Sequence, residues 1–220
     1  MRINKFVARA SGLSRRAVDK AVAANRILIN NQSAKIGQDI LPTDKVELDG
    51  KILHIPDQYT TIMLNKPVNF VVSRTGQGSQ TIYELLPKEL HKFKPIGRLD
   101  KDSSGLLLLT DDGEMANVLT HPKFFKQKIY EVFLNKPLTA DHKIKIEQGV
   151  ILADGLSKVQ LNGQDKKWIV TLSEGRNRQI RRTFDELNYK VTELRRISFG
   201  KYKLGDLELG KYKVVNSDKT

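Results

Sequence analysis

The sequence predicts an α+β protein in which a small N-terminal domain of helices and hairpins precedes a larger domain with a mixed sheet. Two observations support this fold class. The predicted strands and helices do not alternate strictly, as they would in a doubly wound parallel fold. The 220 residues also suffice for a small domain joined to a medium-sized one. Short elements give way to longer ones near Asp57, so we expect domains at 1–56 and 57–220.

The first element in order is a short amphipathic helix. Ser14 occupies a helix N-cap position, and the apolar residues among 17–22 follow at helical spacing. This spacing places Arg15, Arg16 and Lys20 on one exposed face of the helix.

The remaining elements are predicted from the alternation of apolar residues and from turn dipeptides such as Asn30-Asn31, Asp154-Gly155 and Asn162-Gly163. Strands are expected at 27–29, 45–48, 59–64, 70–73, 106–109, 128–134, 159–161 and 168–172. Helices are expected at 82–90, 112–119 and 178–187.

The charge of the chain predicts a polyanionic partner. The formal net charge is +13, with two basic zones at 1–35 and 174–203. Neither zone has the broad apolar face of an interfacial helix, so nucleic acid is favoured over a membrane surface. The alternative is an ordinary solvated surface.

Several function classes are disfavoured by composition. No apolar run approaches the length of a membrane span, and no continuous apolar segment marks a secretory signal. The chain has no cysteine, and its histidines lack ligand spacing, so we do not expect a protein-bound transition metal. A cytoplasmic protein is the expectation.

A polar loop bounded by glycines, Gly97 to Gly105, runs directly into the apolar segment 106–109. Such a loop holds a reactive side chain on a rigid support, and Asp100 is the candidate within it. From the residues alone, a turn residue or a member of a surface ion pair is the favoured interpretation of Asp100. Together with Asp102, Asp111 or Asp112 it can also form the Mg²⁺ site of a nuclease.

Four motifs in order resemble the bacterial ribosomal RNA pseudouridine synthases, the family of the small-subunit synthase and its large-subunit relatives. They are PIGRLDKDSSGLLLLTDDG, MLNKPVNFVVS, QKIYEVFL and EGRNRQIRR. The N-terminal segment is similar to the alpha-L (S4-type) RNA-binding domain. The resemblance implies a largely antiparallel catalytic sheet with flanking helices and a central cleft. A ribosome-assembly factor of the same architecture, without activity, is the main alternative.

The resemblance also implies roles for individual residues. Asp100 matches the catalytic aspartate, Tyr130 the uracil-contacting tyrosine, and Arg181 the basic partner of the aspartate, although Arg178 or Arg182 can take that place. Arg98 is expected to fill the space left by a flipped base. Candidate phosphate contacts are Arg15, Arg16, Lys20 and Arg26 in the N-terminal domain and Arg176, Arg178 and Arg182 in EGRNRQIRR.

The implied reaction converts a uridine of ribosomal RNA to pseudouridine by base flipping and rearrangement of the glycosidic bond, without a cofactor. The motif EGRNRQIRR is closer to the large-subunit members, so 23S RNA is expected as the target, with 16S RNA as the runner-up. The expected partner is ribosomal RNA or a ribosomal precursor particle, and the protein is expected to be a monomer.

Overall fold

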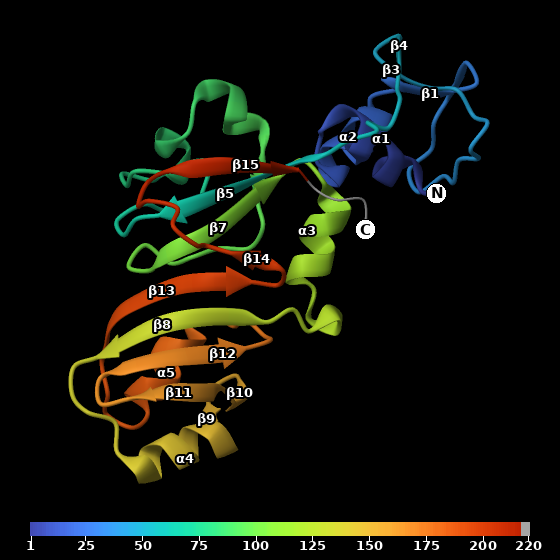
Figure 1. Ribbon diagram of the computed structural model, residues 1–220. Helices are drawn as coiled ribbons and strands as arrows, with labels where there is room; N and C mark the ends of the chain where they lie inside the picture. The colour runs from blue at the N-terminus through green and yellow to red at the C-terminus, as the bar shows by residue number, and fades with distance from the viewer. Residues whose placement is uncertain (217–220) are drawn as a thin grey trace. The chain divides into compact units, whose positions relative to one another are not determined.

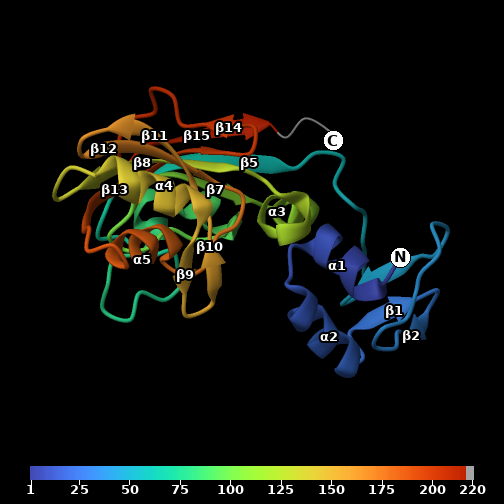
Figure 2. The ribbon, with the colours of Figure 1, turned by 90° about the horizontal axis from the view of Figure 1, so that it is seen from below.

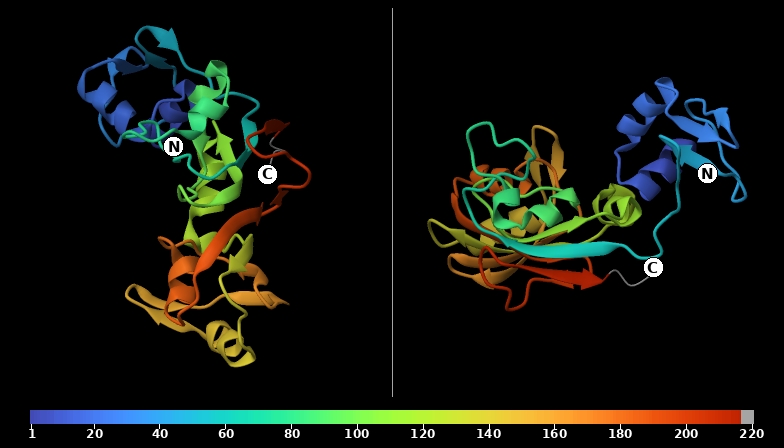
Figure 3. Two further views of the ribbon diagram at one scale, coloured as in Figure 1. Left: turned by 90° about the vertical axis from the view of Figure 1, so that its left-hand side faces the viewer. Right: turned by 90° about the horizontal axis from the view of Figure 1, so that it is seen from above.

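The computed structural model describes residues 1–216, so the end of the predicted second domain, 217–220, lies outside the described residues. The chain divides into two compact units. The first comprises residues 1–60 and 111–113 together with Asn216, and the second comprises residues 61–110 and 114–215. Figures 1, 2 and 3 trace the elements of both units from different sides.

The first unit combines short helices with a small antiparallel sheet. Its elements are α1 (Ile3–Ser11), α2 (Arg15–Ala23), β1 (Ile27–Ile29), β2 (Gln32–Ser33), β3 (Val46–Leu48) and β4 (Lys51–Ile52). The strands pair in the order β2-β1-β3-β4. Ser14 caps α2 as predicted, because its side chain accepts a hydrogen bond from the Ala17 amide at 3.1 Å. Ile3, Val7, Val18 and Ile27 join the helices and the sheet in one buried core.

The second unit is built on a long mixed sheet with the strand order β11-β12-β8-β13-β7-β5-β15, to which β6 and β14 add at β7 and β13 (Figure 1). The strands are β5 (Thr60–Lys66), β6 (Lys94–Pro95), β7 (Ser104–Thr110), β8 (Lys128–Leu134), β11 (Gln160–Gln164), β12 (Lys167–Leu172), β13 (Val191–Phe199), β14 (Tyr202–Lys203) and β15 (Tyr212–Asn216). A separate hairpin consists of β9 (Val150–Leu152) and β10 (Gly155–Ser157).

Helices accompany this sheet. They are α3 (Gly113–Thr120), α4 (Ala140–Gln148) and α5 (Gln179–Asp185), with 3-10 turns η1 (Ile82–Leu85), η2 (Lys88–Lys92) and η3 (Pro122–Phe124). In the part of the chain that the structure describes, no helix has the length and apolar character needed to cross a bilayer. The arrangement confirms the predicted α+β class.

The apolar run of β7 reflects its place in the middle of the sheet. Successive side chains of a strand point to opposite faces. Leu107 and Leu109 accordingly join one buried cluster, and Leu106 and Leu108 join another. Both faces of the sheet are therefore covered at β7, and the loop that precedes it has a rigid base.

Two predicted elements between β5 and β7 were wrong. The segment expected as a strand at 70–73 makes only an isolated bridge, Val71 with Thr81. The helix expected at 82–90 is divided into η1 and η2 around Pro87. Proline lacks an amide hydrogen and keeps the residue before it extended, as Leu86 is here with φ −121° and ψ 143°. The sequence reading also missed α4 and β13.

Candidate active site

Asp100 lies in the loop between β6 and β7, which the sheet supports from below. Its side chain is 36% exposed, so it is anchored in the fold and open to a ligand. Within the loop, the Ser103 amide donates to the Asp100 carbonyl at 3.1 Å, and the Asn69 amide donates to the Lys101 carbonyl at 2.7 Å. These two bonds fix the backbone of the loop that carries Asp100.

Lys66, at the end of β5, supports the same loop from inside the protein. Its side chain is fully buried, and its Nζ donates to the Ser103 carbonyl at 2.7 Å and to the Pro67 carbonyl at 2.9 Å. Burial lowers the pKa of Lys66 to about 8, although the negative charges of Asp100 and Asp102 act in the opposite direction. The lysine thus couples the Asp100 loop to the sheet.

A cleft of about 490 Å³ opens beside Asp100. Tyr130 on β8 and Arg196 on β13 are partners across neighbouring antiparallel strands, so their side chains lie on one face of the sheet. Both line the cleft, together with Lys128 and Phe199. Tyr130 is 9% exposed and therefore contributes an aromatic surface to a nearly closed wall. The cleft that the resemblance implied is present in the second unit.

The segment 174–178 and the first turn of α5 bring arginines to the Asp100 loop. Arg178 has φ 47°, a left-handed conformation just before the helix begins. Its Nη1 and Nη2 donate to the two carboxylate oxygens of Asp102 at 3.1 Å, and Nη1 lies 3.7 Å from Oδ2 of Asp100. One guanidinium therefore compensates the charges of two carboxylates.

Arg181 contacts the backbone of the Asp100 loop. It is nearly buried, and it donates to the carbonyls of Val191 and Asp102, both at 2.8 Å. Its Nε makes an ion-pair contact with Asp102 Oδ2 at 3.3 Å without hydrogen-bond geometry. Arg178, one of the alternatives that the motif left open, is thus the arginine within ion-pair distance of Asp100, and the pairing of Arg181 with Asp100 stays a prediction.

These arginines also determine the protonation of Asp102. Burial raises the pKa of this carboxyl group, but the hydrogen bond from Arg178 and the charges of Arg181 and Arg178 outweigh that effect and hold the pKa below its usual value. Burial lowers the pKa of Lys128 in the cleft wall, Arg196 lowers it further, and Glu174 opposes both.

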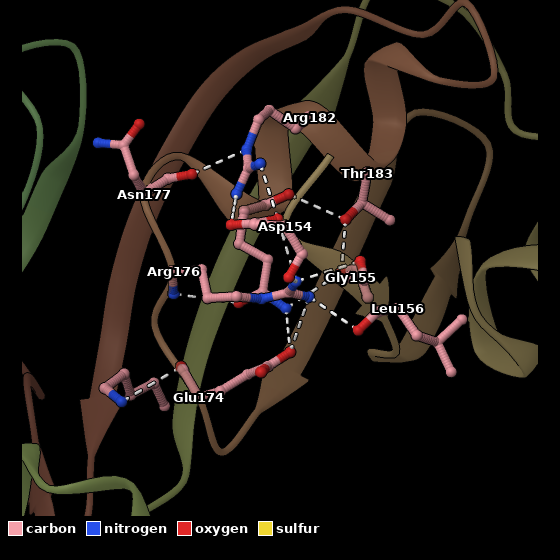
Figure 4. A network of polar contacts seen from close by, with 11 residues as sticks. Asp154, Gly155, Leu156, Glu174, Arg176, Asn177, Arg182 and Thr183 are labelled. Atoms are coloured by element: carbon pink, nitrogen blue, oxygen red, sulfur yellow. Dashed lines mark hydrogen bonds and ion pairs between the residues drawn. The ribbon is translucent and has the colours of Figure 1, made fainter. Parts of the chain in front are cut away.

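A polar network joins residues 174–182, called here the arginine segment, to the β9–β10 hairpin. Asp154 lies at the centre of this network (Figure 4). Arg182 donates to both carboxylate oxygens of Asp154 at 2.9 and 2.8 Å. Arg176 donates to Asp154 Oδ1 at 3.0 Å and to the Leu156 carbonyl at 2.9 Å. The hydrogen bond from Arg182 lowers the pKa of Asp154, although partial desolvation opposes it. The hairpin thereby holds the segment that carries Arg178.

The predicted RNA contacts have different surroundings. Arg98, Arg176 and Arg178 line the cleft, whereas Arg182 faces Asp154 and is not among the lining residues. The predicted phosphate contacts in the first unit are all exposed. They are Arg15, Arg16, Lys20 and Arg26.

Two of these exposed arginines have protein partners. Arg15 donates to the Asn4 side chain at 3.0 Å, and Arg26 makes a two-point ion pair with Asp49 at 2.8 and 2.6 Å.

Sequence reasoning missed Lys66 and Asp154 as parts of the site. Asp154 belongs to the dipeptide Asp154-Gly155, which was interpreted only as a turn, and Lys66 was interpreted only as part of the motif MLNKPVNFVVS. The alternative of a Mg²⁺ nuclease relied on neighbouring carboxylates. In residues 1–216 no three side chains of histidine, cysteine, aspartate or glutamate gather as metal ligands would, and Asp100 and Asp102 share an arginine instead.

A comparison with known proteins decides the class of this site. Residues 60–186 match the RNA pseudouridylate synthase family. The chain belongs to this family. The match contains the Asp100 loop, Tyr130 and the arginine segment, and it confirms the predicted enzyme class, an isomerase that forms pseudouridine.

Relatives extend the similarity over both units. An RNA pseudouridine synthase of Aquifex aeolicus (strain VF5) is 34% identical over 98% of this chain and 90% of its own. The dual-specificity RNA pseudouridine synthase RluF of Escherichia coli (strain K12) is 30% identical over 99% of this chain and 76% of its own. A crystal structure of a pseudouridylate synthase superimposes with a TM-score of 0.71, at 32% identity, over 98% of this chain and 96% of the other.

Some members of the family are much longer. Ribosomal large subunit pseudouridine synthase B of Xanthomonas campestris pv. campestris is 34% identical over 92% of this chain but only 44% of its own length. The chain therefore spans less than half of that relative.

Proposed function

We propose that this protein converts a uridine of 23S ribosomal RNA to pseudouridine, with Asp100 as the reactive carboxylate. The observation that carries the proposal is the placement of Asp100 beside a cleft of about 490 Å³ with an aromatic wall at Tyr130. Sites of this size hold small organic ligands, and a nucleobase is such a ligand. Nη1 of Arg178 lies 3.7 Å from Oδ2 of Asp100 and places a positive charge beside this carboxylate.

The chemistry requires no redox step and no hydrolysis. The bond from ribose C1′ to N1 breaks, the uracil turns, and a bond forms from C1′ to C5. The proton on C5 is lost and a proton is gained at N1, so the product is an isomer of the substrate. Asp100 acts either as a nucleophile at C1′ or as a base toward the 2′ proton, and both routes use the ionised carboxylate.

The target base enters the cleft by leaving its stack. Flipping costs a few kcal/mol, which contacts with the protein must offset. Tyr130 offers a face to the uracil, and Arg98, exposed at the cleft, fills the space that the base vacates. Arg176 and Arg178 at the cleft wall contact the backbone near the target. Arg181 acts through the loop, because it binds the Asp102 carbonyl.

The first unit supplies a second RNA contact of the alpha-L (S4-type) kind. It has exposed basic residues on α2, Arg15, Arg16 and Lys20, and Arg26 follows that helix. A uracil pocket cannot by itself select one uridine of a ribosome, so contacts outside the pocket are needed for target choice. The protein acts as a cytoplasmic monomer on ribosomal RNA or a precursor particle.

The choice of 23S RNA is supported by the motif EGRNRQIRR and by relatives named as ribosomal large subunit pseudouridine synthases. Because one relative is named a dual-specificity RNA pseudouridine synthase, the assay should include more than one RNA. Pseudouridines formed by the purified protein on unmodified 16S and 23S transcripts are to be mapped chemically. We expect one new site in 23S RNA. A site confined to 16S RNA contradicts the target but not the reaction.

The role of Asp100 is tested in the same assay with Asp100→Asn, which keeps the shape of the side chain and removes its charge. We expect turnover to fall at least about a hundred-fold, as for loss of a catalytic acid–base group, and RNA affinity to stay within a few-fold. Asp141→Asn, an exposed carboxylate at the start of α4, is the matched control. Retention of more than about a tenth of the turnover contradicts a catalytic Asp100.

A further inference from the structure

The segment 121–127, called here the HPKFFKQ loop, exposes aromatic side chains between α3 and β8. Phe125 is 74% exposed and Phe124 is 36% exposed. Figure 1 shows the loop as the turn after the lower end of α3, just before the chain enters β8. Phe125 is thus one of the most exposed large apolar side chains of the second unit, and burial in the core does not account for it.

The backbone at Phe125 adds a cost to this exposure. Phe125 has φ 46°, a left-handed conformation that a bulky side chain rarely adopts. Such a conformation costs of order 1 kcal/mol or more and persists where surrounding structure enforces it. Here the Phe125 amide donates to the Pro122 carbonyl at 3.0 Å and closes η3. A strained residue that projects its ring into solvent indicates a role for the ring outside the fold.

The charges around the loop favour an anionic partner. Lys123, Lys126 and Lys128 lie next to the two phenylalanines in the sequence, and the chain has no acidic residue between Glu114 and Glu131. Lys123 Nζ lies 4.7 Å from the centre of the Phe124 ring. Aromatic rings interleaved with cations are the arrangement by which proteins bind unpaired nucleotides, with bases stacked on rings and phosphates near the charges.

The loop adjoins the active-site cleft. Thr120 and Pro122 on one side of the two phenylalanines and Lys128 on the other all line the cleft. The HPKFFKQ loop therefore forms part of the cleft rim. A nucleotide next to a uridine held in the cleft meets this rim first.

We propose that the HPKFFKQ loop is a stacking platform for an unpaired base adjacent to the target uridine, with the base on Phe125 and its phosphate at Lys123 or Lys126. This inference rests on the proposed function for the uridine in the cleft. The platform accepts any base, because every base offers a π face, and it assists binding rather than the bond rearrangement.

The direct test replaces Phe125 with a fluorescent ring. Trp168, the one tryptophan of the chain, is 4% exposed and gives a constant background. In the variant Phe125→Trp, single-stranded RNA containing the target uridine should quench the new emission. Ile144→Trp, at a position on α4 that is 52% exposed, is the control and should show no quenching. Inorganic polyphosphate, which has charge without bases, should also leave Phe125→Trp unquenched.

A second variant separates binding from chemistry. Phe125→Ala should weaken RNA affinity about five-fold or more, the loss of one base–ring stack. Its single-turnover rate at saturating RNA should stay within two-fold of wild type. Phe125→Asn should weaken binding equally without lowering Tm, because asparagine tolerates the left-handed backbone.

The outcomes distinguish the platform from the proposed substrate. Three outcomes would overturn the platform, whatever the pseudouridine-forming activity. They are unquenched emission of Phe125→Trp with RNA bound, quenching of that emission by polyphosphate, and unchanged RNA affinity of Phe125→Ala. Absence of new pseudouridine in 23S RNA, with quenching and affinity loss intact, would overturn the proposed target and leave the platform standing.

Discussion

Arginines are held differently in the two units. In the first unit, Arg26 pairs with Asp49 while both side chains remain about half exposed, and Arg15 binds a neutral amide. In the second unit, Arg181 is 9% exposed and donates to two backbone carbonyls. Surface pairs contribute little to stability, whereas buried arginines shape the backbone around them. The net charge of +13 therefore combines cations available to RNA with cations that build the site.

After the loss expected for Asp100→Asn, the largest effect is expected at Asp154, which holds the arginine segment without lining the cleft. Asp154→Asn removes the charge that binds Arg176 and Arg182 and should lower kcat by up to roughly 100-fold, because the arginine segment moves. RNA affinity should change much less. Single-turnover rates at saturating RNA measure the effect, and Asp141→Asn is the control. An unchanged kcat would show that the hairpin does not position the site.

The next effect contrasts two arginines of the same segment. Arg181→Met leaves the carbonyls of Val191 and Asp102 without donors and should destabilise the fold by roughly 2 to 4 kcal/mol. Arg178→Ala removes a half-exposed group, so the free energy of unfolding should fall by less than about 1 kcal/mol. For turnover, the comparison is with Arg181→Lys, and Arg178→Ala should lower turnover more strongly than that variant. Chemical denaturation and turnover assays together test the contrast. Equal stability losses would contradict it.

A third effect concerns pH and Lys66. Its pKa is about 8 in the folded protein, and the ordinary value is 10.5, so between these values the unfolded chain binds more protons. Stability from this group should therefore rise as pH increases from about 8 to about 10.5, by up to about 3 kcal/mol. Below pH 8, Lys66 is charged in both the folded and the unfolded protein, so folding carries the full cost of desolvating that charge.

This rise is measured by denaturation at several pH values. It should disappear in Lys66→Gln. Asp100→Asn should lower the pKa of Lys66 further and move the start of the rise to lower pH, because Asp100 favours the charged lysine. An identical profile in all three proteins would contradict the coupling of Lys66 to the loop.

The smallest effect is expected in the first unit. Replacing Arg15, Arg16 and Lys20 by alanine should flatten the slope of log affinity against log salt by about two to three, if each meets a phosphate. Arg26→Ala should change the slope less, because Asp49 already compensates that charge. Binding titrations over a range of salt give both slopes. A larger change in this slope for Arg26→Ala than for the triple variant would contradict the view that Asp49 keeps Arg26 from binding phosphate.

Much of the site was predictable because it depends on short-range order. The Asp100 loop and β7 are contiguous in sequence, and a continuous apolar run after a glycine-bounded polar loop specifies both. The N-cap at Ser14 is equally local. The assignment of Tyr130 to the cleft wall came from the family resemblance, and the structure places it there.

The remaining parts depend on long-range contacts or on backbone conformation. The bond from Lys66 to Ser103 spans 37 residues, and that from Arg182 to Asp154 spans 28. Arg178 lies 3.7 Å from Asp100, 78 positions away in the sequence, and its left-handed backbone is not indicated by any residue preference. The predicted helix at 82–90 failed for a local reason that was available, namely Pro87.

The junction of β7 and β13 has a consequence for folding kinetics. These parallel strands meet at two residue pairs, Arg195 with Ser104 and Arg196 with Gly105, and a Cβ at position 105 would collide with the Arg196 backbone. The bond from Arg196 to the Leu106 carbonyl closes a loop of 90 residues. Closing so long a loop costs entropy before its contacts form, which makes it a slow step. Since Asp100 precedes β7 and Arg196 lies on β13, enzymatic activity should return only in the last phase of refolding.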